Sequence, residues 1–137
     1  MKFSGYQVVG IIFSVAIISA ILIWSTISKK KLLKTHELSS AKITNCSYGG
    51  RGNSGTITFN FDFYISRTEI GGSSSINSSE LNFDDAKVFF LGKTFPVVYN
   101  PDNFNNNFLL IRPKDFERFH YSFPDSLRWV LKYIHIK

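Results

Sequence analysis

Cysteine is almost absent from this 137-residue sequence, because Cys46 is the only one. A single cysteine excludes a disulfide within the chain and a CxxC metal or redox motif. His36, His120 and His135 are far apart in the sequence, and none has a cysteine or carboxylate at a spacing typical of metal ligands. The sequence therefore predicts neither a metal centre nor a cofactor.

Acidic residues are missing from the first 36 positions. All ten lie at or after Glu37, and eleven of the sixteen basic residues share that region, which leaves it a net charge of +1. The other five basic residues flank an apolar stretch near the N-terminus: Lys2, Lys29, Lys30, Lys31 and Lys34. Because the basic excess belongs to this flank, the pI of about 9.5 does not indicate a basic stripe for nucleic-acid binding.

The apolar stretch runs from Tyr6 to Ile27, 22 residues without a charge. A helix rises about 1.5 Å per residue, so roughly 20 apolar residues cross a hydrocarbon core of about 30 Å. Tyr6 and Trp24 lie near opposite ends, where aromatic rings favour the membrane interface. We predict a short tail over 1–5 and a retained transmembrane helix over 6–28. A cleaved signal peptide is the alternative, but its apolar core is typically 7–15 residues.

The lysines after this stretch predict its orientation. Lys29, Lys30, Lys31 and Lys34 outnumber the one lysine before it, Lys2. Because positively charged flanks stay on the cytoplasmic side, we expect a single-pass protein of the inner (plasma) membrane with its C-terminal domain in the cytoplasm. Residues 29–39 are predicted to form a basic juxtamembrane tether, and the part from Leu32 to Ser40 is interpreted as either a short extension of the helix or a tether.

Residues 40–112 are predicted to form a small β domain. Apolar and polar residues alternate over 57–65, which is typical of a half-buried strand. A weaker strand over 41–48 precedes it, with the Gly/Asn/Ser-rich loop 49–55 between them. Residues 67–72 are interpreted as a second turn and 73–79 as a third, polar strand.

A helix and two further strands are expected next. Asn82 is a candidate N-cap, Asp84 and Asp85 follow it in the first turn, and Gly92 can end the helix. Strands are predicted over 94–99 and 108–111. The order strand, strand, strand, helix, strand, strand fits a small antiparallel barrel of the OB type, with an SH3-like or open twisted sheet as the alternative.

The residues GKTFPVVYNPDN, from Gly92 to Asn103, form a motif. It resembles the G-x-x-V-x-V-x-Y-[DN]-P-x-N signature of a family of small bacterial membrane-anchored β domains of unknown function. That family also has an anchor followed by basic residues, a hairpin with a Gly-rich loop and a Ser-rich third strand. The motif contains a turn, in which proline fixes φ and Asx side chains bond the local backbone. The turn residues are Tyr99, Asn100, Pro101, Asp102 and Asn103.

Two departures separate this chain from the family. Phe104 stands where the family often has proline, and residues 119–137 are too short and too charged for the second membrane span that the family often carries. The resemblance implies no catalytic activity.

The C-terminal segment, 113–137, is predicted to be helical. A short helix can begin at Pro113, and an amphipathic helix is expected over 126–137. The latter has an apolar face with aromatic neighbours and cations that suit a membrane surface, the candidates being Leu127, Trp129, Leu131, Lys132 and Tyr133. The alternative is that its apolar face, with Val130 and Ile134, packs on the β domain.

No grouping of side chains in the sequence predicts catalysis. Asp84 and Asp85 are adjacent, so on a helix they point about 100° apart and form no acid–base pair. Cys46 has no neighbouring base. We therefore expect a non-enzymatic, membrane-anchored binding or adaptor module with the lipid bilayer and one protein as partners. No small-molecule substrate or nucleic acid is expected. The alternative hypothesis is an immunity protein that neutralises a toxin at the inner membrane.

Overall fold

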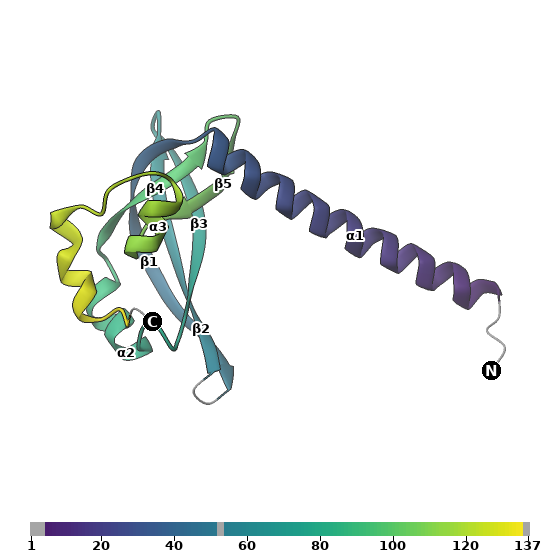
Figure 1. The fold of residues 1–137 in the computed structure, drawn as a ribbon, viewed down its shortest axis with the longest axis horizontal. Helices are drawn as coiled ribbons and strands as arrows, with labels where there is room; N and C mark the ends of the chain where they lie inside the picture. The colour runs from purple at the N-terminus through teal and green to yellow at the C-terminus, as the bar shows by residue number, and fades with distance from the viewer. Residues whose placement is uncertain (1–4, 52–53, 136–137) are drawn as a thin grey trace.

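The long N-terminal helix α1 (Gly5–Lys34) stands apart from the rest of the fold in the computed structural model of this chain (Figure 1). The structure describes residues 5–51 and 54–135, with side chains from residue 10 onward. In α1, the consecutive residues Ile11, Ile12 and Phe13 are 54%, 64% and 68% exposed. Because consecutive helical residues point about 100° apart, the part of α1 over residues 11–27 is apolar on all sides and does not pack on the domain. It is the one helix in the described residues that is long and apolar enough to cross a membrane.

Five antiparallel strands form the domain: β1 (Glu37–Arg51), β2 (Ser54–Ile65), β3 (Thr68–Asn77), β4 (Thr94–Asn100) and β5 (Asn103–Leu109). Their order in the sheet is β3-β2-β1-β4-β5. The long strand β1 pairs with β4 over residues 37–42 and with β2 over residues 41–51, and its register shifts between Ile43 and Asn45. Such a bulge bends a strand, which allows β1 to serve two neighbours on a curved sheet.

The sheet curls until its two edge strands, β3 and β5, meet. The backbone N–H of Leu109 donates to the buried hydroxyl of Ser74 on β3 over 3.1 Å. At Gly72 on β3, an added Cβ would collide with Asn107 of β5 and with the Phe61 ring, so only glycine permits this approach. The result is a nearly closed five-stranded barrel, with a helical segment between β3 and β4, as predicted for the OB type.

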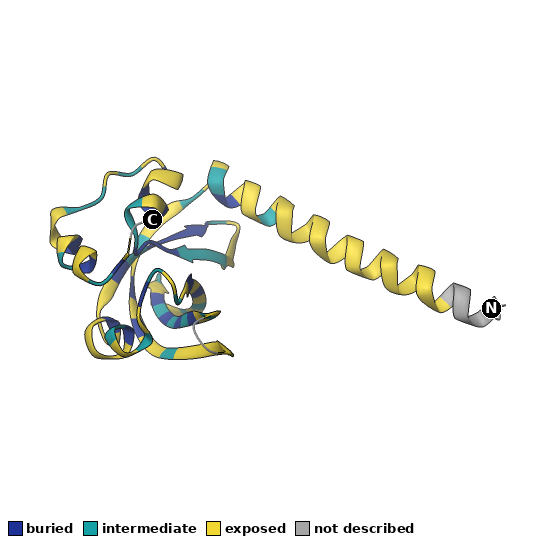
Figure 2. Ribbon diagram, turned by 60° about the horizontal axis from the view of Figure 1, so that its bottom comes forward, coloured by how far each residue is buried: buried dark blue, intermediate teal, exposed yellow. Residues whose placement is uncertain are grey.

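The barrel interior is filled by alternate residues of β2 and by a helical plug. Phe59, Phe61 and Phe63 are fully buried, which confirms the strand predicted from their alternation. Figure 2 shows buried residues along the barrel strands, in contrast to the exposed helix α1. The plug consists of α2 (Phe83–Asp85) and the π-helical turn η1 (Ala86–Phe90), and Asn82 caps it through Oδ1. The Phe90 ring stacks on the rings of Phe59 and Phe95, so the plug closes one end of the barrel.

The turn predicted over 67–72 is wrong in position. Strand β3 already begins at Thr68, and a two-residue turn at Ser66 and Arg67 joins it to β2. Both turn residues have positive φ, 47° and 70°, a conformation usually given to Asn and Gly. Gly71 and Gly72 suggested a turn, but they lie within the strand.

The C-terminal segment wraps the outside of the barrel. It contains α3 (Pro113–Arg118) and the 3₁₀ helix η2 (Asp125–Lys132), so the predicted amphipathic α-helix over 126–137 is not formed in the described residues. Its apolar side chains pack on the domain: Leu127, Val130 and Ile134 are buried. The Trp129 ring contacts those of Phe90 and Phe95, at centroid distances of 5.2 and 6.0 Å. Phe90 and Phe95 are fully buried and Trp129 is half-buried against them, which favours packing over contact with a membrane surface.

An ionic cluster fastens this segment. Arg112 donates to Asp115 through Nε and Nη2 (3.0 and 2.7 Å) and to Glu80 through Nη1 (3.0 Å). Lys114 Nζ lies 2.7 Å from the same carboxylate oxygen, Glu80 Oε2. The backbone carbonyl of Glu80 also accepts from His135 N–H, so Glu80 joins both ends of the C-terminal segment to the loop after β3.

Candidate functional site

The junction between α1 and the barrel brings together residues from distant parts of the chain. The amide of Asn106 on β5 donates to the carbonyl of Ser28 over 2.8 Å. One turn further along α1, Lys31 Nζ lies 3.3 Å from the carboxylate of Asp102, in the turn between β4 and β5. The ion pair is exposed and contributes little stability, but both contacts hold the β4–β5 hairpin against α1.

Apolar packing completes the junction on another side of α1. Leu32 is buried in the core and Leu33 is half-buried against it. His36 donates from Nδ1 to the carbonyl of Leu32 over 3.0 Å, which satisfies one of the carbonyls left unpaired at a helix end. The His36 ring lies edge-on to the rings of Phe119 and Tyr121, at centroid distances of 5.1 and 5.7 Å.

The tether predicted over 29–39 is therefore not a separate linker. Helix α1 continues to Lys34, and β1 begins three residues later at Glu37. The stretch holds the end of a helix, a two-residue connection and the start of a strand. The orientation of α1 relative to the barrel is set by packing, because Leu32 is part of the core.

Glu37 and Tyr99, the first residue pair in the register of β1 and β4, link the two strands at the junction. Tyr99 is opposite Glu37 in the register, and its hydroxyl donates to Glu37 Oε2 over 2.6 Å. The hydrogen bond to this carboxylate, together with burial and the negative charge, raises the pKa of Tyr99. Tyr99 is therefore a neutral donor at physiological pH, a structural role in the junction.

The motif turn lies in the junction. Strand β4 ends at Asn100, whose Oδ1 accepts from the N–H of Asp102 over 2.9 Å. Asn103 makes the next such bond, from the N–H of Asn105 over 3.3 Å. Pro101 stands between the strands, so the turn chemistry is as expected. Asn100 is fully buried, and its Nδ2 has no partner among the described residues.

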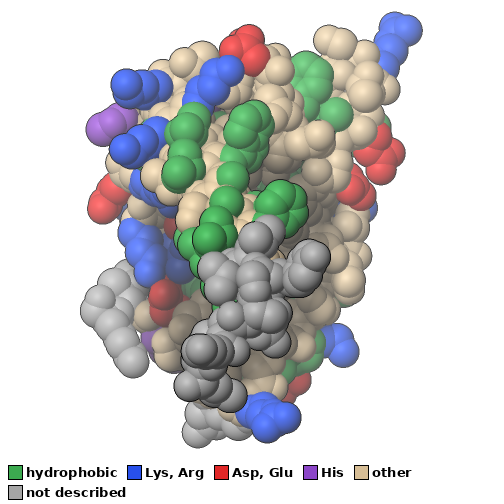
Figure 3. Space-filling view, turned by 90° about the vertical axis from the view of Figure 1, so that its right-hand side faces the viewer, with side chains coloured by type: hydrophobic (Ala, Val, Ile, Leu, Met, Phe, Trp, Pro, Cys, Tyr) green, Lys and Arg blue, Asp and Glu red, His purple; other side chains and the backbone are tan. Residues whose placement is uncertain are grey.

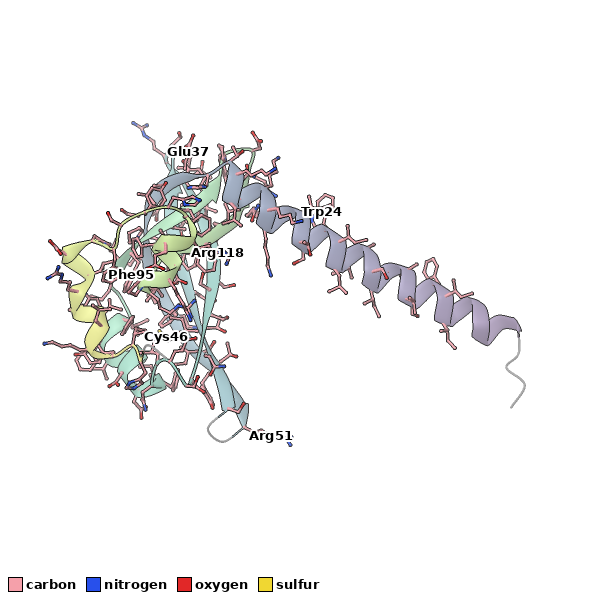
Figure 4. All side chains as sticks on the ribbon, in the orientation of Figure 1. Trp24, Glu37, Cys46, Arg51, Phe95 and Arg118 are labelled. Atoms are coloured by element: carbon pink, nitrogen blue, oxygen red, sulfur yellow. The ribbon has the colours of Figure 1, made fainter. Side chains whose placement is uncertain are left out.

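The other residues that were predicted to flank the membrane lie on α1 itself. Trp24 is 74% exposed, and Lys29, Lys30 and Lys34 are exposed as well. Tyr6, the other predicted interface residue, is not among the residues whose side chains the structure describes. Figure 4 shows Trp24 on α1 clear of the barrel. Because these lysines follow the exposed apolar run directly, the chain changes from apolar to basic just before it reaches the barrel.

Sequence patterns did not predict several junction residues. Asn106 and Ser28 are 78 positions apart, and an asparagine in an Asn-rich strand carries no signal of a helix partner. His36 and Arg118 belong to no motif in the sequence, so their spacing carries no signal of the aromatic rings that they contact. Only the topology, which places the start of β1 beside the end of β4, brings these groups together.

The described residues hold no cluster of candidate metal ligands, because no group of three or more His, Cys, Asp or Glu within them could hold a metal ion. Cys46 is half-buried, and burial raises the pKa of its thiol despite the nearby Lys87, so the thiolate is disfavoured. Asp84 and Asp85 begin α2 as the cap requires.

A second feature is an apolar surface on the plug and η2, formed by Val88, Phe89, Leu91 and Leu131; we call it the distal apolar surface. These side chains are 69%, 37%, 42% and 40% exposed, respectively. The Phe89 ring stacks on that of Tyr133, which directly follows η2, at a centroid distance of 4.3 Å, so the plug and the C-terminal segment are in contact here. Figure 1 shows α2 and the yellow C-terminal segment on the side of the barrel opposite to α1.

This chain was compared with known protein families, curated proteins and solved structures. A scan against models of protein families, a search of curated proteins and a search of solved structures each find no match to this chain. Its function is therefore inferred from its own geometry.

Proposed function

We propose that this protein is a single-pass membrane protein whose barrel is a non-enzymatic binding module held at the membrane surface. The observation that carries the proposal is the exposure of α1. Eleven apolar side chains between positions 11 and 27 are each at least 46% exposed. At about 1.5–3 kcal/mol per apolar side chain removed from water, a bilayer stabilises α1 by roughly 15–30 kcal/mol. This exceeds the net stability of a typical domain, about 5–15 kcal/mol.

The orientation follows from the lysines at the end of α1. Lys29, Lys30, Lys31 and Lys34 lie between the apolar run and the barrel, and a cluster of this kind stays on the cytoplasmic side. We infer that the barrel lies in the cytoplasm at the plasma membrane. Reporters fused after Lys137 test this: a cytoplasm-active fusion supports the inference, and a periplasm-active fusion in a bacterial host contradicts it.

The distal apolar surface supports the binding role. The segments that carry it, the plug and the C-terminal segment, lie on the side of the barrel opposite to α1 (Figure 1), so we infer that it lies away from the membrane that α1 would occupy. Neighbouring apolar side chains exposed on two adjacent segments are typical of protein–protein interaction sites. We infer that a protein partner in the aqueous phase covers this surface.

Site-specific photocrosslinking in native membranes tests the binding role. A crosslinking residue replaces Val88 in the full chain, and the matched control replaces Tyr64, which is 61% exposed on β2. We expect one protein to crosslink from position 88 and not from position 64, and Leu131→Asp to abolish the product. Equal products from both positions, or none from position 88, contradict the proposal. A toxin as the crosslinked protein would select the immunity role.

A further inference from the structure

Arg118, at the end of α3, is held on aromatic rings beside the junction. Its guanidinium carbon lies 5.5 Å from the centroid of the Phe108 ring and 5.8 Å from that of Phe119. A guanidinium on an aromatic face keeps its N–H edge available for an acceptor. No carboxylate of the described residues lies within ion-pair distance of Arg118, although the side chain is exposed.

Three lysines on α1 are likewise exposed and without a carboxylate partner among the described residues. Lys29, Lys30 and Lys34 are exposed and form no ion pair with the described residues, whereas Lys31 is paired with Asp102. Another junction carboxylate, Glu37, accepts from Tyr99. Four cations around the base of α1 therefore have no partner carboxylate in the described part of the chain.

Contacts in the junction place Arg118 at the level of these lysines. The Phe119 ring under Arg118 contacts the His36 ring, and His36 follows the last residue of α1 by two positions. In the view along α1, Lys and Arg side chains gather on one flank of the helix (Figure 3). Figure 4 shows Arg118 on the side of the barrel from which α1 departs.

We propose that Lys29, Lys30, Lys34 and Arg118 form a binding site for the headgroups of anionic phospholipids. The proposal rests on the membrane anchoring of α1 proposed above. The exposed apolar run ends at Ile27, two residues before Lys29, so the cations lie at headgroup depth when that run fills the hydrocarbon core. Arg118 supplies the planar fork that binds a phosphate with two N–H groups, and the lysines supply positive charge.

Lipid binding by the full chain in detergent micelles tests this site. Native mass spectrometry counts bound phosphatidylglycerol and phosphatidylcholine at equal concentrations, for the parent and for Arg118→Gln. The matched control is Arg128→Gln, which removes the same charge from η2. We expect the parent to prefer phosphatidylglycerol, Arg118→Gln to weaken that binding about fivefold, and Arg128→Gln to leave it unchanged.

Each other result has a separate meaning. Equal binding of the two lipids by the parent overturns the site, as does an unchanged preference in Arg118→Gln. Displacement of phosphatidylglycerol by the same concentration of inorganic phosphate would show that the site recognises free phosphate and overturn the lipid assignment. Arg118→Lys keeps the charge and should retain part of the preference. Flotation with phosphatidylcholine vesicles tests the anchor alone, so its failure is distinguishable from failure of the site.

Discussion

Replacement of Arg112 by methionine should destabilise the barrel by about 3 kcal/mol. The Arg112 and Asp115 side chains are only 13% and 6% exposed, so the substitution leaves a buried carboxylate without its cation. Removing one partner of a buried ion pair typically costs about 3–5 kcal/mol. The lower end applies here, because Glu80 keeps Lys114 and Asp115 still accepts from the N–H groups of Ile111 and residue 112.

The assay is urea unfolding of the full chain in detergent, followed by Trp129 fluorescence. A Trp24→Phe background removes the other tryptophan. With a slope of about 1–3 kcal/mol per molar urea, Arg112→Met should lower the midpoint by about 1–3 M. Arg112→Lys keeps the charge but not the fork to both carboxylates, and should cost about 1–2 kcal/mol. A loss below about 1 kcal/mol for Arg112→Met would refute the role given to this cluster.

The same cluster predicts a pH dependence. Burial by itself raises the pKa of Glu80, but hydrogen bonds from Lys114 and Arg112 outweigh it, so the pKa is lowered on folding. Glu80 therefore contributes stability above its ordinary pKa, and the contribution is lost as the pH falls through the lowered value. The urea midpoint should decline over this acidic range, and Glu80→Gln should flatten that decline. An identical pH profile in Glu80→Gln would contradict the assignment.

Five further substitutions test the fold in the same assay. Phe61→Ala should cost about 3–5 kcal/mol as a buried phenylalanine, and Asn60→Ala on the outer face well under about 1 kcal/mol. Equal losses would contradict the strand's orientation. Arg67→Gly should stabilise by about 0.5–1 kcal/mol, since φ is 70° there, and destabilisation would argue against this turn. Leu32→Ala should cost about 2–3 kcal/mol and the exposed Leu22→Ala nothing measurable, whereas equal effects would place Leu32 outside the core.

Local patterns were sufficient to predict β2 and the start of the plug, but not the bounds of every strand. The third strand was predicted over 73–79 and the fifth over 108–111, whereas β3 and β5 run over Thr68–Asn77 and Asn103–Leu109. The alternation around Phe61 identifies one buried face, and Asn82 marks the start of α2 through its own side chain. These features depend on neighbours within a few residues, so sequence spacing carries them. Short connections account for the neighbours β1–β2, β2–β3 and β4–β5. The pairing of β1 with β4 is not given by a short connection, because β2, β3 and the plug lie between them in the chain.

Longer-range packing decided the features that the patterns missed. Gly72 suggested a turn, but it is required within β3 because Asn107 and Phe61 approach it there. The apolar positions of η2 fit either a membrane or a protein surface, and only the Phe90 and Phe95 rings beside Trp129 decide between them. The junction with α1 depends on β5 lying beside the helix end, which no spacing in the sequence expresses.

Alkaline carbonate extraction of native membranes tests the central claim, that α1 crosses a bilayer, most directly. A surface-bound protein is released by this treatment, whereas a spanning apolar helix holds its protein in the lipid. We expect the full chain to remain in the pellet, with its N-terminus intact. Release into the supernatant, or a mature N-terminus near residue 25, would contradict the claim.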